Sequence, residues 1–142
     1  KIANIANVKP ADNLMMTSAQ VVELRKAGMQ IGAHTVSHPI LATISLSEAR
    51  EEISTSKKFL EQLLGENITL FAYPNGKPSV DYKPEHKTLI RELGFESAVS
   101  TKWGAANHSS DIYQIPRFTP WDRSKLRFGI RLLRNFLSPI AP

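Results

Sequence analysis

The chain has 142 residues, a formal net charge of +5 at pH 7 and no cysteine, which excludes disulfide bridges and thiolate metal sites. Hydrophobic residues make up 42% of the sequence, enough for one packed domain. No apolar run approaches the roughly 18 residues of a membrane span, and the positive charge is too dispersed to favour nucleic acid. We therefore expect one domain over 1–142, with an irregular lead-in over 1–14 and no nucleic-acid partner.

Helix and strand signals alternate along the chain. Thr17 with Gln20 and Ser45 with Glu48 form two capping boxes, and Pro84 suits the first turn of a third helix. The predicted helices cover 17–27, 45–64, 84–93 and 124–137, and the predicted strands cover 29–33, 67–72, 96–100 and 112–118. This alternation predicts an α/β fold built from parallel βα units.

The last predicted helix, over 124–137, is amphipathic. Its apolar residues fall on one face, and its cationic residues fall elsewhere: Lys125, Arg127, Arg131 and Arg134. Such a helix can bind an anionic membrane surface, but a cationic flank is usually a solvated face. We expect no membrane contact.

Two of the four histidines, His34 and His38, follow the predicted strand over 29–33 within a single turn. Imidazole is the commonest protein ligand of transition metals, and a pair at a strand end can share one ion. Because a residue before proline avoids the α region, His38 belongs to a loop or a single turn. The alternative is that His34 caps the strand and His38 is a surface turn residue. A metal site also needs a third ligand, usually a carboxylate.

The sequence around this pair resembles the polysaccharide deacetylases, the NodB-homology family of carbohydrate esterases. Their metal motif is His-[Ser/Thr]-x-x-His after an apolar strand and a glycine, and residues 31–39 have this pattern. Residues 71–76, which include Pro74 and Gly76, resemble the family's third motif. Further similarity covers 93–99 and 115–118, so the resemblance extends over nearly all of 17–118.

The resemblance implies a distorted or partial (β/α) barrel that removes N-acetyl groups from an acetylated amino-sugar polysaccharide or oligosaccharide. It also implies a divalent metal, expected to be Zn²⁺, bound by one Asp and two His, and a location at the cell envelope, periplasmic or extracellular. On this basis His34 and His38 are the metal ligands.

The resemblance also implies roles for residues after the other strands. The backbone N–H of Asn75 would contact the tetrahedral oxyanion, and Arg117 would organise a carboxylate or contact the sugar. The expected substrate contacts are Tyr73, Pro74 and Trp103. Without the resemblance, 73–76 is equally an ordinary turn, and Arg117 is equally a partner in a structural salt bridge.

The chain departs from the family in its acidic residues. The family's Asp-Asp pair, which supplies the catalytic base and the third metal ligand, is absent, and Asp12 follows no apolar strand. Since the chain begins at Lys1, we expect that it starts after the first strand and is inactive alone. His86 and His108 lie in polar contexts and are expected to be solvated rather than catalytic. The alternative function is a non-catalytic carbohydrate-binding or structural domain of the same fold.

Overall fold

The computed structural model describes residues 14–118 and 121–137, so most of the predicted lead-in over 1–14 lies outside them. The chain divides into two units, Lys1–Gln30 and Ile31–Pro142. In the first unit, α2 (Ser18–Lys26) has the predicted capping box, because the Gln20 N–H donates to Thr17 Oγ1 and the Thr17 N–H donates to Gln20 Oε1. No helix in the described ranges is both long and apolar enough to cross a membrane.

Four segments of the second unit run parallel and side by side. β1 (Leu70–Ala72) pairs with β2 (Ser97–Val99), and the single residues Ala33 and Ile115 bridge the remaining edges of β1 and β2. The segments are therefore neighbours in the order in which they occur in the sequence. This order is typical of an arc of a (β/α) barrel, whereas a doubly wound sheet reverses its strand order.

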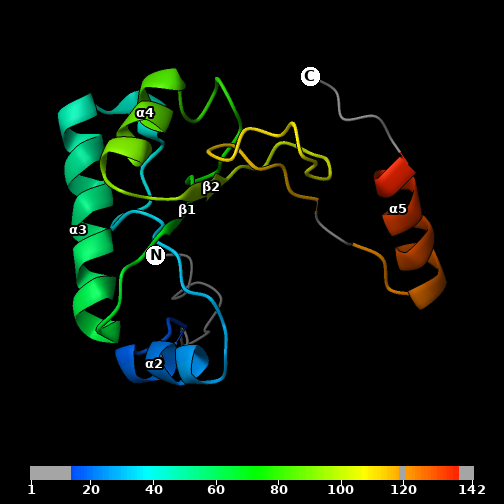
Figure 1. Cartoon of the computed structure of the whole chain (residues 1–142), viewed down its shortest axis with the longest axis horizontal. Helices are drawn as coiled ribbons and strands as arrows, with labels where there is room; N and C mark the ends of the chain where they lie inside the picture. Colours follow the sequence, from blue (N-terminus) through cyan, green and yellow to red (C-terminus); the bar gives the residue numbers. More distant parts are fainter. Residues whose placement is uncertain (1–13, 119–120, 138–142) are drawn as a thin grey trace, which may run out of the picture. The chain divides into compact units, whose positions relative to one another are not determined.

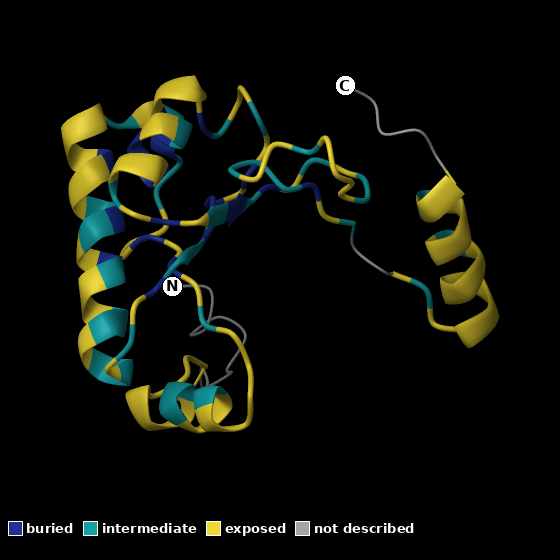
Figure 2. Cartoon of the chain, viewed as in Figure 1, coloured by how far each residue is buried: buried dark blue, intermediate teal, exposed yellow. Residues whose placement is uncertain are grey.

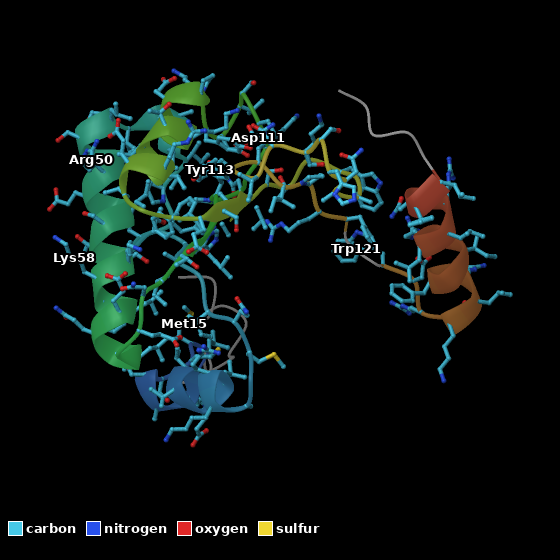
Figure 3. The ribbon with its side chains drawn as sticks, viewed as in Figure 1. Met15, Arg50, Lys58, Asp111, Tyr113 and Trp121 are labelled. Atoms are coloured by element: carbon cyan, nitrogen blue, oxygen red, sulfur yellow. The ribbon has the colours of Figure 1, made fainter. Side chains whose placement is uncertain are left out.

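Two helices provide the crossover connections. α3 (Leu46–Leu64) joins the Ala33 segment to β1, and α4 (Pro84–Glu92) joins β1 to β2. The two helices lie together beside the strand pair (Figure 1), and Arg50 of α3, labelled in Figure 3, forms an ion pair with Glu92 of α4. The short 3₁₀ turn η1 (Leu41–Thr43) precedes α3.

The core fills the space between these helices and the strands, and the buried residues concentrate there (Figure 2). Tyr73 stacks on Tyr82 with ring centroids 3.7 Å apart, and Phe71 contacts the edge of Tyr73. The buried apolar residues are Ala33, Leu41, Ala49, Ile53, Ile68, Phe71, Tyr73, Tyr82, Leu89, Ile90, Phe95 and Ala98. Burial of these side chains holds the parallel segments in register.

The helices agree with the sequence better than the strands do. The predicted strand over 29–33 is wrong except at Ala33, because Met29 is 57% exposed and only Ala33 bridges β1. The predicted strand over 112–118 is reduced to the bridge at Ile115. Pro116 follows directly, and the N–H of the next residue, Arg117, donates to the Lys102 carbonyl in the loop after β2 instead of extending the bridge.

The predicted C-terminal amphipathic helix is α5 (Lys125–Leu137). Within the described residues its apolar face remains exposed, as at Leu126, Ile130, Leu133 and Leu137. One cation of its basic flank, Arg131, forms a two-bond ion pair with Asp122.

His86 differs from the sequence prediction that it is solvated. Its side chain is 3% exposed, and its Nδ1 accepts the Lys83 N–H at 3.0 Å at the start of α4. Nδ1 must be unprotonated to accept this bond, and burial lowers the pKa of His86 further. His86 is therefore a neutral helix cap, whereas His108 is exposed as expected.

The His86 cap predicts a pH-dependent loss of stability. Because its folded pKa is lowered, its contribution to the free energy of unfolding is complete above the ordinary histidine pKa of about 6.5 and declines as the pH falls toward the folded value. Urea denaturation at a series of pH values should show this decline in wild type and in the exposed-residue control His108→Gln. The decline should be smaller in His86→Gln, which keeps a capping acceptor without the titration; an identical decline in both variants would contradict the assignment.

Candidate active site

His34 follows Ala33 directly, at the carboxyl end of its parallel segment. The Ala33 N–H donates to the Leu70 carbonyl at 2.8 Å, and the Ala72 N–H donates to the Ala33 carbonyl at 2.9 Å. His34 Nδ1 lies 2.7 Å from the Ala72 carbonyl oxygen. Since a carbonyl only accepts, Nδ1 carries the proton and the lone pair lies on Nε2, the arrangement found in metal-binding histidines.

His38 lies beside His34. Their ring centroids are 4.8 Å apart and their ring planes meet at 74°. Two imidazoles bound to one tetrahedral zinc ion through nitrogens at about 2.0–2.1 Å have ring centres about 5 Å apart. The pair therefore fits two positions of a shared metal site.

The loop between the two histidines departs from ordinary backbone geometry. Thr35 has φ 64° and His38 has φ 59°, left-handed conformations that non-glycine residues seldom adopt. The Thr35 hydroxyl donates to the His34 carbonyl at 2.5 Å and accepts the His38 N–H at 3.2 Å. Both bonds join the Thr35 side chain to the loop backbone and so restrain the turn.

Glu52 of α3 also contacts this loop, and the sequence analysis did not identify it. Its Oε2 accepts the N–H groups of Val36 and Ser37 at 2.8 and 2.9 Å, and its Oε1 accepts the Ser37 hydroxyl at 2.7 Å. The available signal was its place in the helix, since Glu52 adjoins Ile53 and follows Ala49 by three residues, on the side of α3 that becomes buried. A carboxylate on the buried side of a helix needs hydrogen-bond donors to replace water.

The loop after β1 lies at the same edge of the sheet. Asn75 is exposed with φ 54°, and Gly76 is buried with φ 79°. The Gly76 carbonyl accepts the Thr101 N–H at 2.8 Å, which ties this loop to the one after β2. No acceptor for the Asn75 N–H is found among residues 14–118 and 121–137.

Two further candidates follow β2 and Ile115. The Arg117 N–H donates to the Lys102 carbonyl at 2.9 Å, and its Nε donates to the Ser100 carbonyl at 2.7 Å. In the described ranges Arg117 forms this bond to a carbonyl rather than a salt bridge. Trp103 is 52% exposed, with its ring centroid 6.3 Å from that of Phe118.

The expected sugar contact at Tyr73 needs correction. Tyr73 is 1% exposed, and its hydroxyl donates to the carbonyl of Tyr113 (labelled in Figure 3) at 3.0 Å. Tyr113 follows β2 in the sequence. Burial also raises the pKa of the Tyr73 phenol. Pro74 is likewise buried. Both residues therefore pack in the core beneath the loop instead of facing a ligand. Of the other predicted site residues, Asn75, Trp103 and Arg117 are accessible.

The acidic ligand expected from the family is not among the described residues. No group of three or more His, Asp or Glu side chains that could hold a metal is found in 14–118 and 121–137. Asp12 lies outside these ranges. The edge therefore presents two adjacent histidines, whereas a metal site of this kind requires at least one more ligand.

The sequence was compared with known protein families. The sequence model described as polysaccharide deacetylase matches residues 6–98. The chain belongs to the polysaccharide deacetylase family. It is 26% identical over 102 residues to YxkH of Bacillus subtilis, which covers 72% of this chain and 35% of that protein.

Two other relatives agree with this assignment. The chain is 32% identical over 56 residues to the peptidoglycan-N-acetylmuramic acid deacetylase PdaC of Bacillus subtilis, covering 39% of this chain and 12% of PdaC. It superimposes with a TM-score of 0.69 and 27% identity on the deacetylase PplD of Streptococcus pyogenes, solved with acetate, covering 76% and 46% of the two chains. The chain thus spans less than half the length of each of these relatives, and its fold is part of their (β/α) barrel.

Gly32 predicts how closely the His34 segment must approach β1. A Cβ at Gly32 would lie 3.0 Å from the Leu70 carbonyl oxygen and 3.2 Å from the Leu70 Cβ. Gly32→Ala should therefore push the segments apart and cost about 1–3 kcal/mol in the free energy of unfolding, measured by urea denaturation. The control Gly129→Ala meets no atom within 4 Å and, in a helix interior, should be neutral or stabilising by up to about 1 kcal/mol; equal stability of the two variants would contradict the close approach.

Proposed function

We propose that this chain forms part of a metal-dependent deacetylase that hydrolyses N-acetyl groups on an amino-sugar polysaccharide. The observation that supports it most is the arrangement of the two histidines, with His34 Nδ1 bound to the Ala72 carbonyl and the His38 ring beside it. A strand cap needs only the first of these features, whereas a shared metal ion needs both.

His34 and His38 would hold a divalent metal, for which zinc suits the imidazole donors. When bound, such an ion polarises a carbonyl and lowers the pKa of a coordinated water. The N–H of Asn75, an exposed residue after β1, would donate to the oxyanion that develops on the acetyl group. Arg117 and Trp103 would contact the polymer, through a guanidinium and an exposed ring respectively.

The carboxylates that should supply the third ligand and the general base are not among the described residues. We therefore propose that the chain binds metal weakly and has little activity alone. PdaC is named for peptidoglycan, and PplD was solved with acetate, which is the second product of any N-deacetylation. By analogy, we place the reaction at the cell envelope, with an acetylated amino-sugar polymer as substrate.

The absence of these carboxylates from the described residues also supports a second function. A domain that keeps the fold without a general base would bind a carbohydrate without hydrolysing it. Trp103, 52% exposed, could contact a sugar in either case. The two functions differ in whether acetate is released.

The metal assignment predicts that both histidines determine zinc binding. His34→Ala and His38→Ala should each lose most of the bound zinc, because a site with two protein ligands cannot hold the ion well with one. Metal content after equilibrium dialysis against zinc measures this, with His108→Ala as the matched control at an exposed histidine. Equal zinc in all four proteins would contradict the assignment.

The reaction is tested by acetate release. A longer form of the protein that includes an upstream Asp-Asp pair should release acetate from chitin oligomers, peptidoglycan or poly-N-acetylglucosamine, whereas the 142-residue chain should release little. The Trp103→Ala variant of the longer form should bind these polymers less tightly. Polymer binding with no acetate from any of the three substrates would favour the carbohydrate-binding domain.

A further inference from the structure

The loop that carries His38 needs support from outside its own backbone. Two of the five residues from His34 to His38 have positive φ and neither is glycine. Each such conformation is unfavourable relative to ordinary backbone. The two hydrogen bonds of the Thr35 hydroxyl lie within the loop, so they restrain its shape but do not attach its tip to the rest of the protein.

Glu52 supplies an attachment from α3. Its carboxylate receives three hydrogen bonds, two from backbone N–H groups and one from a hydroxyl, all from Val36 and Ser37 at the tip of the loop. The Ser37 N–H holds the pKa of Glu52 below its usual range, so the carboxylate is ionised at neutral pH. Hydrogen bonds to a charged acceptor are stronger than those between neutral groups.

The element that carries Glu52 is itself fixed. α3 begins with the Ser45–Glu48 capping box and ends at Gly65 in the left-handed conformation, and its residues Ala49 and Ile53 are fully buried. Glu52 lies between these two anchors in the sequence. A carboxylate on a rigid helix can hold a strained loop in one position.

We propose that Glu52 is a positioning residue for the metal site, which fixes the loop tip and thereby the place of His38 relative to His34. This inference rests on the proposed function, because it presumes that the two histidines bind metal. Glu52 does not contact the histidine rings. It acts through Val36 and Ser37, in the way that outer groups orient the ligands of metal sites.

The neighbouring acid provides a matched control. Glu51 lies on the same turn of α3 and lines the same surface hollow of about 370 Å³ as Glu52, Val36 and Ser37, but no hydrogen bond joins it to the loop within the described residues. Glu51→Ala removes an equal charge from the same surface. It therefore separates the hydrogen bonds of Glu52 from the general field of the acidic helix.

The experiment measures zinc affinity of the folded chain by competition with a fluorescent chelator at neutral pH, below the onset of thermal unfolding. We expect Glu52→Ala to weaken zinc binding by about 10- to 100-fold, as removal of an outer-shell partner does in other metal sites, while Glu51→Ala binds like wild type. Glu52→Gln should recover most of the affinity, because an amide oxygen can accept both N–H groups and the amide nitrogen can donate to the Ser37 hydroxyl.

Ser37→Ala keeps the test decisive if Glu52→Ala does not fold. It removes one of the three hydrogen bonds from the loop side and should weaken zinc binding by a smaller factor than Glu52→Ala. Wild-type affinity in folded Glu52→Ala would overturn the positioning role. Equal losses in Glu51→Ala and Glu52→Ala would also overturn it. If Glu52→Ala is unfolded, wild-type affinity in Ser37→Ala overturns it.

The histidine variants distinguish this failure from failure of the proposed function. Loss of zinc in His34→Ala and His38→Ala with full affinity in folded Glu52→Ala would overturn only the role of Glu52. Full affinity in both histidine variants would place the metal elsewhere and overturn both proposals. A cobalt-loaded sample adds a second readout, because the visible spectrum of bound Co²⁺ should change in Glu52→Ala if the ligand geometry relaxes, and should not change if Glu52 affects stability alone.

Discussion

The parallel pairing of Ala33 with β1 is the constraint on which the candidate site depends. The two backbone bonds of Ala33 place the next residue, His34, beside Ala72, where its Nδ1 binds the Ala72 carbonyl. One interaction thus joins two loops that are 38 residues apart in the sequence. Because the neighbouring segments also run parallel, the loops after β2 and Ile115 begin at the same edge, as in other βα folds.

The loop after β1 is stabilised by residues that pack in the core. Tyr73 and Pro74 directly follow β1, yet both are buried, and the Tyr73 ring is stacked on Tyr82. Gly76 has no room for a side chain, since a Cβ would lie 3.0 Å from the Tyr73 carbonyl oxygen and 3.2 Å from the Thr101 backbone nitrogen. Asn75 is therefore an exposed residue with buried neighbours on both sides, Pro74 and Gly76.

The sequence predicted the helices and the histidine pair well because their signals are local. Capping residues lie three positions apart, and His34 and His38 lie four apart. It predicted less about features that depend on how distant segments pack together. These features are the burial of Tyr73, the cap formed by His86 and the three hydrogen bonds of Glu52. An aromatic residue before Pro74 can line a groove or fill a core, and only the parallel pairing of β1 with β2 decides for the core.

The backbone of the histidine loop favours the proposed metal site over a simple strand cap. A cap requires only the bond from His34 Nδ1 to Ala72. Nothing in that role requires Thr35 and His38 to adopt positive φ, a cost that a protein meets only where surrounding contacts hold the strain. Those contacts are present, from the Thr35 hydroxyl and from Glu52, in a loop whose two imidazole rings lie 4.8 Å apart. A strained loop held in this way supports our proposal that both rings share a ligand.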